Sequence, residues 1–530
     1  MNTEGLWDSH VMNGTRLRKA IETANASGYQ IDKEAFEFLK TISATDDPVQ
    51  IVEKALRQMQ AFERNVICIS KDALEQILKN EEPQKEIAAQ DSTIPEITDE
   101  TVTAQVSEGK TPFHPYAKEI EADINVVEDA GTKISSSGTI EDFTQYFQDR
   151  FKQMERLLRQ RIDVKSATSI VEALKAHSNA RLKIIGMITE KRESKQRTIL
   201  TVEDLRSSIT VLVPQNADPQ VQTKARSLLL DQVVCISVMK SRTGLLIAED
   251  IILPDIAQKT QHKATAPIYA VLTSDMHVGS TKFTREAFNR FILWLNGKYG
   301  NEMMRKMAGH VKYVLVAGDI VDGVGVYPNQ VKELKIRDVG KQYRLAARCF
   351  EQIPDYVEVV ITPGNHDAPR KALPQPAISK EFLETLEESR RLCSLGSPCS
   401  LSLHGVDVLM FHGRSLDDVV SGVPGITHEH PEKAMKLLLQ SRHLAPVYGG
   451  KTPISPENRD LLVIDRVPDI FHAGHVHTVE CGNYRGVTIV NSGCWQEQTD
   501  YMRRNGFTPT PAKVPVVNLQ TSEITIVPFG

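Results

Sequence analysis

The sequence predicts a multidomain protein with a small all-α module at its N-terminus, a disordered acidic linker, a small β-barrel and a larger α/β domain. Three observations support this prediction. The chain has 530 residues, of which 41% are apolar, and this is enough for two to four domains with real cores. Residues 81–130 contain 13 acidic residues against 3 lysines. Beyond them, five short strand-like runs precede five further apolar runs that each end in a polar cluster.

The composition excludes a membrane protein and a disulfide scaffold. No run of 18 or more apolar residues occurs, and residues 1–7 lack the basic and then apolar pattern of a signal peptide, so we expect a cytoplasmic protein without membrane contact. The seven cysteines are scattered with no Cys-x-x-Cys spacing, which favours reduced, buried thiols. The net charge is −5, so the chain outside the acidic stretch is mildly basic, which is compatible with nucleic acid.

The first two segments are assigned by periodicity and composition. Residues 1–75 are predicted to form the helical module, because apolar residues recur at three- and four-residue spacings from residue 15 to residue 60. A module this small is interpreted as a docking module rather than an enzyme. Residues 76–138 are acidic, contain four prolines and have few periodicities, and this pattern predicts a disordered linker.

A connecting helix is predicted for residues 139–165. The sequence from Thr139 to Asp142 is typical of a helix start, and apolar residues recur every three or four positions after it. The opposite face is basic and includes Arg150 and Arg156. We interpret this segment as a helix that packs on the next domain and exposes its basic face to solvent; direct contact with DNA is the alternative.

A small closed barrel of the OB type is predicted for residues 166–258. Five strand-like runs are separated by polar turns within about 75 residues, as in such barrels. OB barrels often bind oligonucleotides, but binding of single strands needs aromatic residues for base stacking, and this segment contains none. We therefore interpret the barrel mainly as a structural and protein-binding module. The five runs are residues 182–188, 198–202, 209–213, 232–238 and 245–252.

The five apolar runs of residues 259–530 end in clusters of metal-ligand chemistry. Each cluster follows a β-type run, and the carboxyl ends of strands are where sites are built in α/β sheets. The last run ends in Gly-His-Val-His, which places two histidines one residue apart. The candidate donors are, in chain order, Asp275, His277, Asp319, Asn365, His412, His475 and His477, with Asp322, His366 and Asp367 beside them.

The number and type of these donors predict a two-metal site. Seven donors are too many for one ion and suit two ions about 3.5 to 4 Å apart that share a carboxylate. Imidazole mixed with carboxylate suits manganese, iron or zinc better than magnesium or calcium. We therefore expect two divalent ions, with manganese as our choice and magnesium, iron or zinc as alternatives.

In their order along the chain, the motifs Asp-x-His, Gly-Asp-x-x-Asp, Gly-Asn-His-Asp, His-Gly and Gly-His-x-His resemble the calcineurin-like metallophosphoesterase superfamily, which includes DNA-repair nucleases. The resemblance implies a β-sandwich flanked by helices for residues 259–530. It also implies hydrolysis of a phosphodiester without a protein nucleophile. It assigns three donors to each ion and one to both: Asp275, His277 and His477 to the first, Asn365, His412 and His475 to the second, and Asp319 to the bridge.

The same resemblance gives roles to the neighbouring residues. It implies that His366 lies outside the ligand shell and donates a proton or a hydrogen bond to the leaving oxygen. Asp367 is then expected to hold the orientation of His366, and Asp322 to support a ligand.

Segments near the last two motifs narrow the resemblance. The stretches Arg414-Ser-Leu-Asp-Asp-Val-Val420 and Asn491-Ser-Gly-Cys-Trp-Gln496 resemble the small subunit of the archaeal family-D DNA polymerase. This resemblance implies a 3′ to 5′ exonuclease that acts on single-stranded or mispaired DNA ends for proofreading. It also implies assembly with a large catalytic subunit that carries out synthesis. The N-terminal module would then dock other replication proteins.

Two alternatives remain open. A stand-alone phosphatase or phosphodiesterase would share the donors but would not need the N-terminal module, the linker or the barrel. A catalytically silent structural subunit of a polymerase would share the architecture but should have lost donors. All seven donor positions and His366 are intact, which favours an active enzyme.

Three further residues are candidate contacts to the substrate. Arg414 and Arg442 could each grip a phosphate, because a guanidinium can bind it through two hydrogen bonds. His443 follows Arg442 and could approach the substrate with it. A structural ion pair is an equally good interpretation of either arginine.

Overall fold

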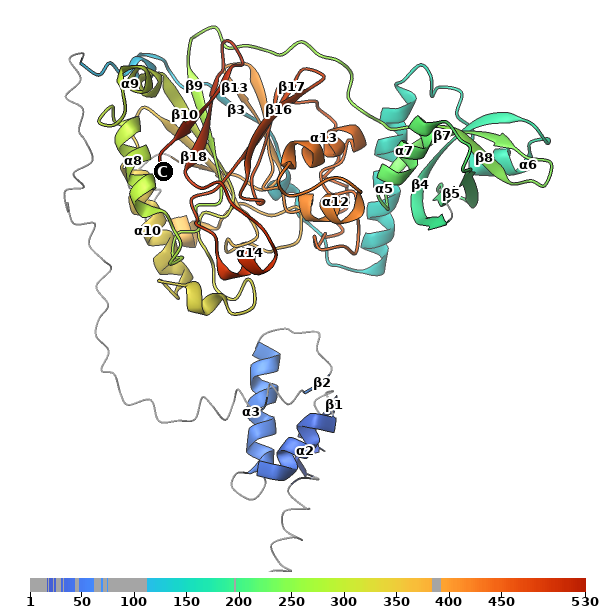
Figure 1. The fold of residues 1–530 in the computed structure, drawn as a ribbon, viewed down its shortest axis with the longest axis horizontal. Coiled ribbons are helices and arrows are strands. Elements are labelled where there is room, and N and C mark those ends of the chain that lie inside the picture. The colour runs from blue at the N-terminus through green and yellow to red at the C-terminus, as the bar shows by residue number, and fades with distance from the viewer. Residues whose placement is uncertain are drawn as a thin grey trace, which may run out of the picture. The chain divides into compact units, whose positions relative to one another are not determined.

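The computed structural model describes residues 112–530 except 195–196 and 384–391, and in the N-terminal part residues 17, 19–21, 23–24, 30–31, 33–42, 47–61, 68–69 and 74. The chain divides into two compact units, Met1–Glu100 and Thr101–Gly530, and each is described by itself (Figure 1). In the described part of the chain, no helix is both long and apolar enough to span a bilayer.

The first unit contains helices α2 (Lys33–Ile42) and α3 (Pro48–Ala61). Strands β1 (Gln30–Ile31) and β2 (Cys68–Ile69) pair in parallel, so the prediction of an all-α module misses one short strand pair. The helices meet through small and aliphatic side chains that recur at helical spacing. The buried core consists of Ala20, Ala24, Ala35, Leu39, Ile51, Val52, Ala55 and Leu74.

The predicted linker is wrong over its C-terminal part. Residues 76–111 lie outside the described residues, but strand β3 (Ile124–Asp129) is ordered and pairs antiparallel with β13 (Cys399–Leu403). Short 3-10 helices lie on either side of it, at Tyr116–Glu119 and Ala130–Lys133. Strand β3 lies at the edge of a sheet and exposes three of its residues. It is therefore held mainly by backbone hydrogen bonds to β13 and less by burial of apolar side chains.

Helix α5 (Ile140–Arg159) begins where the sequence predicts, because Thr139 and Asp142 form a capping box. Its apolar face packs on the barrel through Phe151 and Met154, among others. The basic face is not wholly solvated as predicted: Arg150 is only 1% exposed. Its Nε lies 2.7 Å from Oδ2 of the buried Asp460.

Replacing Arg150 by alanine is expected to lower the free energy of unfolding by about 3 kcal/mol, because it leaves a buried carboxylate without its cationic partner. The expected loss of unfolding free energy is not larger because His443 Nε2, 2.8 Å from Asp460 Oδ2, remains as a hydrogen-bond partner of the carboxylate. Urea denaturation followed by circular dichroism measures it. The matched control is Arg156→Ala, whose exposed pair with Asp465 is expected to contribute less than about 1 kcal/mol. Equal losses for the two variants would contradict the argument.

The predicted barrel is present as a closed five-stranded barrel with strand order β4-β5-β6-β8-β7. Alternating apolar residues of its strands fill the interior together with residues of α6 (Ile170–Lys175) and α7 (Pro219–Ser227). All five predicted runs are strands, and their extents are β4 Arg181–Ser194, β5 Arg197–Glu203, β6 Ser208–Val213, β7 Val233–Lys240 and β8 Leu246–Ile252.

Two six-stranded sheets form the rest of the second unit. The first has the order β12-β11-β10-β9-β18-β19, and its strands β9 to β12 are parallel. The second has the order β16-β17-β15-β14-β13-β3, in which β14, β15 and β17 are parallel. The strands not yet placed are β9 Tyr269–Thr273, β10 Val311–Ala317, β11 Glu358–Thr362, β12 Leu392–Ser394, β14 Val406–Met410, β15 Ile470–Ala473, β16 Val479–Tyr484, β17 Val487–Ser492, β18 Lys513–Asn518 and β19 Ile524–Pro528.

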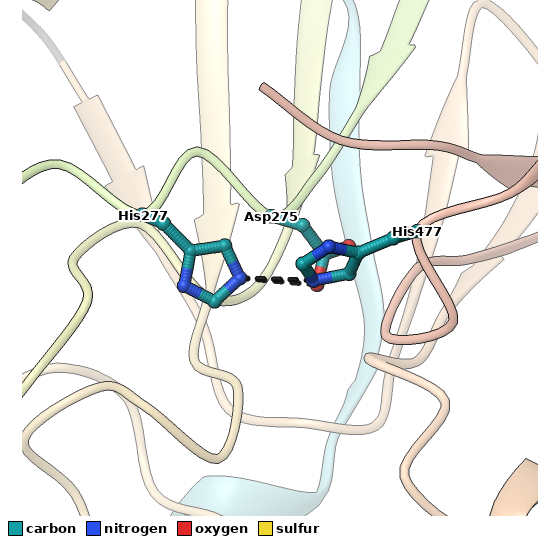
Figure 2. Close-up of side chains that lie close together, drawn as sticks. All are labelled: Asp275, His277 and His477. Atoms are coloured by element: carbon teal, nitrogen blue, oxygen red, sulfur yellow. Dashed lines mark hydrogen bonds and ion pairs between the residues drawn. The ribbon is translucent and has the colours of Figure 1, made fainter. Parts of the chain in front are cut away.

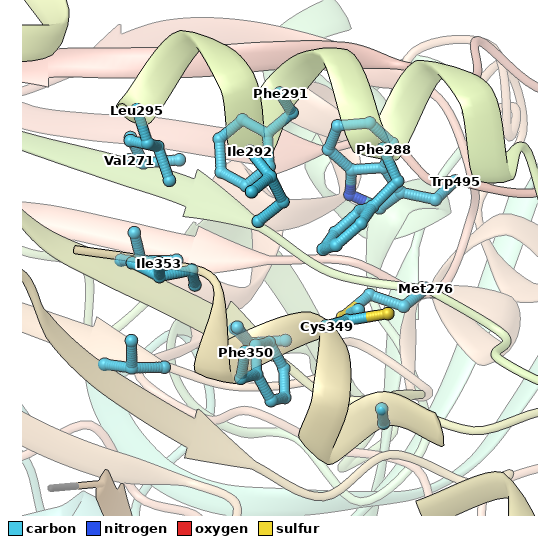
Figure 3. Packing of buried hydrophobic residues seen from close by; sticks show 14 of the residues in the cluster. Val271, Met276, Phe288, Phe291, Ile292, Leu295, Cys349, Phe350, Ile353 and Trp495 are labelled. Carbon is cyan, nitrogen blue, oxygen red and sulfur yellow. The ribbon is translucent and has the colours of Figure 1, made fainter. Parts of the chain in front are cut away.

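The two sheets pack face to face with helices on both outer faces (Figure 1). Aliphatic residues of both sheets, such as Leu315 and Val408, form the core between them. On the first sheet, helix α8 places Phe288 and Phe291 against Trp495, and α10 adds Phe350 (Figure 3). The covering helices are α8 Arg285–Leu295, α9 Glu302–Gly309 and α10 Val339–Glu351 on the first sheet, and α12 Leu416–Gly422 and α13 Pro431–Ser441 on the second.

Candidate metal centre

The seven predicted donors all follow the carboxyl ends of strands. In the first sheet, β9 leads to Asp275 and His277, β10 to Asp319 and β11 to Asn365. In the second sheet, β14 leads directly to His412, and β15 leads to His475 and His477. Because parallel strands of both sheets end at the same edge of the sandwich, residues 200 positions apart become neighbours.

One group of donors consists of Asp275, His277 and His477 (Figure 2). The Nε2 atoms of the two histidines lie 3.0 Å apart. The Oδ1 atom of Asp275 lies 3.3 Å from His477 Nε2 and 3.9 Å from His277 Nε2. This buried carboxylate oxygen has no hydrogen-bond partner among the described residues. Three ligand atoms that converge on one point, one of them unsatisfied, fit a bound cation.

A second group consists of Asp319, His412 and His475, whose ligand atoms lie within 4.8 Å of one another. The Nε2 atom of His412 lies 3.3 Å from Asp319 Oδ2 and 3.0 Å from Asn365 Oδ1. The same Oδ2 atom of Asp319 lies 3.8 Å from His277 Nε2, which belongs to the first group. The Asp319 carboxylate therefore stands between the two groups of donors.

The backbone under the donors is strained. Asp275, His277, Asp319, His475 and His477 have φ angles of 50°, 50°, 52°, 72° and 58°, in the left-handed region. Each such residue costs about 1 to 3 kcal/mol and persists only where the surrounding structure holds it. Here the strand ends and their hydrogen bonds hold it, for example Asp275 N–H to Gly318 O and His277 N–H to Asp319 O. The donors are thus fixed by the fold itself.

Glycines allow the donor loops to approach one another. A Cβ atom at Gly364 would lie 2.2 Å from Asp319 Oδ1 and 2.7 Å from His412 Cε1. A Cβ atom at Gly474 would lie 2.4 Å from Asp275 Oδ2. Both positions face donors of the other sheet or loop, so any larger residue there would push the donors apart.

The site keeps its carboxylates ionised although they are buried. Burial alone would raise the pKa of Asp319, but the nearby His412 and His366 hold its pKa well below the usual range. Burial would raise the pKa of Asp275 as well, but His477 and His412 together lower it. Burial would lower the pKa of His412, but Asp319 raises it to about 9. Anionic oxygens are thus in place for a cation.

His366 lies beside the donors at the wall of the cavity. Its Nδ1–H donates to the backbone carbonyl of Asp322 over 2.7 Å, and its Nε2 lies 3.9 Å from Asp319 Oδ2. Burial lowers the pKa of His366 to about 4. The Asp322 side chain lies 2.9 Å from His277 Nδ1 and so orients that ring. Asp322 therefore contacts the ring of an expected donor, and its supporting role stays a prediction.

Asp367 does not touch the His366 ring, so its predicted orienting role is wrong. Its carboxylate turns back into its own loop and accepts from Gly364 N–H over 2.8 Å and from the Tyr343 hydroxyl over 3.0 Å. Burial, with help from Asp319, raises the pKa of Asp367 to about 6. Asp367 therefore braces the loop that carries Asn365, and the Asp322 carbonyl orients His366.

Of the three candidate substrate contacts, the structure brings only Arg414 to the donors. Arg442 is buried at the end of α13 and donates to the carbonyls of Ile464 and Asp465. His443 is buried and contacts Asp460 over 2.8 Å. Both side chains are satisfied by structural partners away from the cavity, so their prediction as substrate contacts is wrong.

Two residues of the site were missed by the sequence analysis. Asp417 on α12 lies 3.2 Å from His475 Nε2 through one oxygen and 2.9 Å from His428 Nε2 through the other. The two histidines hold the pKa of Asp417 below its usual range despite its burial. Nothing in the spacing indicates these contacts, because Asp417 and His475 are 58 positions apart.

A cavity of about 370 Å³ opens over the donors. Its lining includes the cationic side chains of Arg414 and Lys451 and the aromatic residues Tyr327, Tyr501 and Phe507. It is large enough for a nucleotide-sized group and combines metal donors, cations and rings.

Comparisons with known proteins agree on one family. Residues 270–480 match the family model described as the B subunit of DNA polymerase alpha/epsilon. The chain is similar to proteins named DNA polymerase II small subunit, with 35% identity to that of Archaeoglobus fulgidus over 92% of this chain and 93% of that protein. Identity to the Halobacterium salinarum protein is 34%, over 97% and 99% of the two chains.

The similarity to the Pyrococcus furiosus DNA polymerase II small subunit is 39% identity over 73% of this chain and 63% of that protein, so the match spans less than two thirds of its length. Among solved structures, one described as a novel archaeal phosphodiesterase covers 49% of this chain and 99% of its own, at 15% identity and a TM-score of 0.25. A likeness this low does not bear on function.

Proposed function

Because the chain belongs to the DNA polymerase II small-subunit family, we propose that it is the small subunit of a heteromeric DNA polymerase and that it carries a two-metal 3′ to 5′ exonuclease. The substrates are single-stranded or mispaired DNA ends. A large catalytic subunit carries out the synthesis, and this chain supports it.

One observation supports the nuclease most strongly. Five donors from both sheets, together with Asn365, lie around the carboxylate of Asp319 beside an open cavity. A structural subunit without chemistry has no need for strained backbone, unsatisfied buried oxygens and ionised buried carboxylates at one point. Mixed imidazole and carboxylate ligands suit manganese, iron or zinc, and of these we propose manganese.

In this proposal, some residues of the site bind the metal ions and the phosphate, and His366 transfers a proton. Asp275, His277 and His477 would hold one ion, Asn365, His412 and His475 the other, and Asp319 both. When bound, two such ions would lower the pKa of a water and neutralise charge on the phosphate. Arg414 adds a cation at the cavity wall. The Asp322 carbonyl accepts from Nδ1–H of His366, which leaves Nε2 with a lone pair. Nε2 would take up a proton from water in the cavity and pass that proton to the leaving oxygen.

Digestion of a labelled primer–template tests the proposal. The full chain with manganese should shorten a 3′-mispaired primer from its 3′ end and act more slowly on a matched primer, which strands labelled at the 5′ or the 3′ end distinguish. Turnover of a small phosphodiester without DNA cleavage would favour a stand-alone phosphodiesterase. No turnover of either substrate, by this chain alone or with the large subunit, would favour a silent structural subunit.

Asp417 offers a test of the metal site that does not depend on turnover. Asp417→Asn is expected to weaken manganese binding by about 10- to 100-fold, because the carboxylate holds the imidazole of His475 in the orientation of a ligand. Isothermal titration of the metal-free chain with manganese measures the change. Asp465→Asn, an exposed carboxylate away from the cavity, is the control. Unchanged affinity in Asp417→Asn would remove the residue from the metal site.

A further inference from the structure

Two tyrosines stand at the edge of the cavity that holds the donors. Tyr327 follows β10, and Tyr501 lies on the short helix α14 (Asp500–Arg504). Their ring centroids are 5.3 Å apart with planes inclined by 38°, and the Tyr327 ring lies 6.1 Å from the ring of His366. Tyr501 is 46% exposed, so its ring is accessible to a ligand.

The tyrosines form a wall between two hollows. One side faces the cavity of about 370 Å³ with the donors, and the other faces a smaller cavity of about 150 Å³. Arg414 and Lys451 line the larger cavity, and the exposed Lys332 and Arg504 line the smaller one. Lysine and arginine side chains therefore line both cavities, beside Glu333 and Asp500 in the smaller one.

A single carboxylate fixes both tyrosine-bearing segments. Glu333 accepts from the Tyr327 hydroxyl over 3.1 Å through one oxygen. Through the other it accepts from the backbone N–H of Asp500 over 2.9 Å, at the start of α14. Tyr327 and the backbone that carries Tyr501 are thus positioned before any ligand arrives, so less conformational entropy is lost when a flat group lies on the rings.

We propose that Tyr327 and Tyr501 form a base-stacking subsite for the unpaired terminal nucleotide of single-stranded DNA. This inference rests on the proposed nuclease function. Aromatic faces between cations match a single strand, whose bases stack on rings while its phosphates meet lysine and arginine. The barrel has no aromatic residue among its strands, so stacking falls to the catalytic cavity instead.

The subsite also explains selection of a mispaired end. A base can lie on the tyrosines only after it leaves its partner strand, and this step is least costly for a base that is mispaired or already single-stranded. The tyrosines would therefore favour mispaired over matched DNA ends, because the terminal base of a mispaired end unpairs more easily. This preference does not depend on the base sequence.

Cleavage of two matched single strands tests the subsite, one ending in adenosine and one in an abasic nucleotide. Tyr501→Ala should lower kcat/KM on the adenosine end by about tenfold, the range expected for one stacked base. It should leave the abasic end unchanged, and Tyr501→Phe should behave as the unaltered chain does on both. Tyr448→Ala is the matched control, because Tyr448 is 41% exposed and also contacts two rings, but lies outside this cavity.

Binding provides a second readout that needs no turnover. A single strand with 2-aminopurine at its 3′ end is added to the full chain in EDTA, and its fluorescence should fall on binding because the base stacks. Tyr501→Ala should abolish this fall, and Tyr501→Phe should retain it.

The outcomes separate the subsite from the nuclease. Equal losses on both ends, or unchanged cleavage and quenching in Tyr501→Ala, would overturn the subsite and leave the nuclease standing. Quenching that depends on Tyr501 in a chain that cleaves no DNA would support the subsite and contradict the proposed function. Neither quenching nor cleavage by the unaltered chain would overturn both.

Discussion

Asp319→Asn is expected to abolish the nuclease. The Oδ2 atom of Asp319 lies 3.3 Å from His412 Nε2 and 3.8 Å from His277 Nε2, so it is the one carboxylate that belongs to both donor groups. An amide lacks the negative charge that two cations would share. Hydrolysis of a 3′-mispaired primer should therefore fall by more than about 1,000-fold, because each ion supplies several kcal/mol of stabilisation to the transition state.

Metal content separates this loss from misfolding. The unaltered chain should retain two manganese ions after gel filtration, measured by inductively coupled plasma mass spectrometry, and Asp319→Asn should retain one or none. Circular dichroism of both proteins in EDTA should agree, because asparagine has nearly the shape of aspartate and the fold holds the loop. Two tightly bound ions in Asp319→Asn would refute the bridging role.

His366→Ala is expected to lower kcat by about 100- to 10,000-fold without loss of metal, because we propose that the side chain exchanges a proton and is not a ligand. Its Nδ1 is occupied by the Asp322 carbonyl, and its Nε2 faces the cavity. Titration with manganese should give the same stoichiometry and similar affinity in the variant and the unaltered chain.

The leaving group gives a sharper test of the same residue. The p-nitrophenyl ester of thymidine 5′-monophosphate releases a stable phenolate that needs no proton, so His366→Ala should be much closer to the unaltered chain on this substrate than on DNA. An equal loss on both substrates would show that His366 holds the site together rather than transferring a proton.

The elements that can be predicted from this sequence are those whose residue pattern lies within one short stretch of the chain. The barrel strands alternate apolar and polar residues, and α5 has its capping box within four residues. The donor motifs were found because each lies directly after an apolar run. Their convergence follows from strand direction alone, since parallel strands place their carboxyl ends at one edge.

The errors share a different physical cause, which is that the deciding partner lies far away in the sequence. Strand β3 is held by β13, about 270 residues later. In the sequence, Arg442 resembles a phosphate-binding arginine. In the structure, its guanidinium donates to the backbone carbonyls of Ile464 and Asp465. Asp417 lies in no recognisable motif, because its place in the site depends on its contact with His475 on another loop. Contacts between residues so far apart cannot be predicted from the residue pattern of a single sequence.

The spread of the donors over two sheets has a consequence for biosynthesis. Asp275 and His477 are separated by about 200 residues, and their loops meet only when both sheets have packed. Contacts of such long sequence separation form late in folding, because the intervening chain must first close. A nascent chain that has reached residue 470 holds five of the seven donors and lacks the last two. We therefore expect a chain truncated before His475 to lack part of both proposed ion sites, and so to lack the proposed nuclease activity.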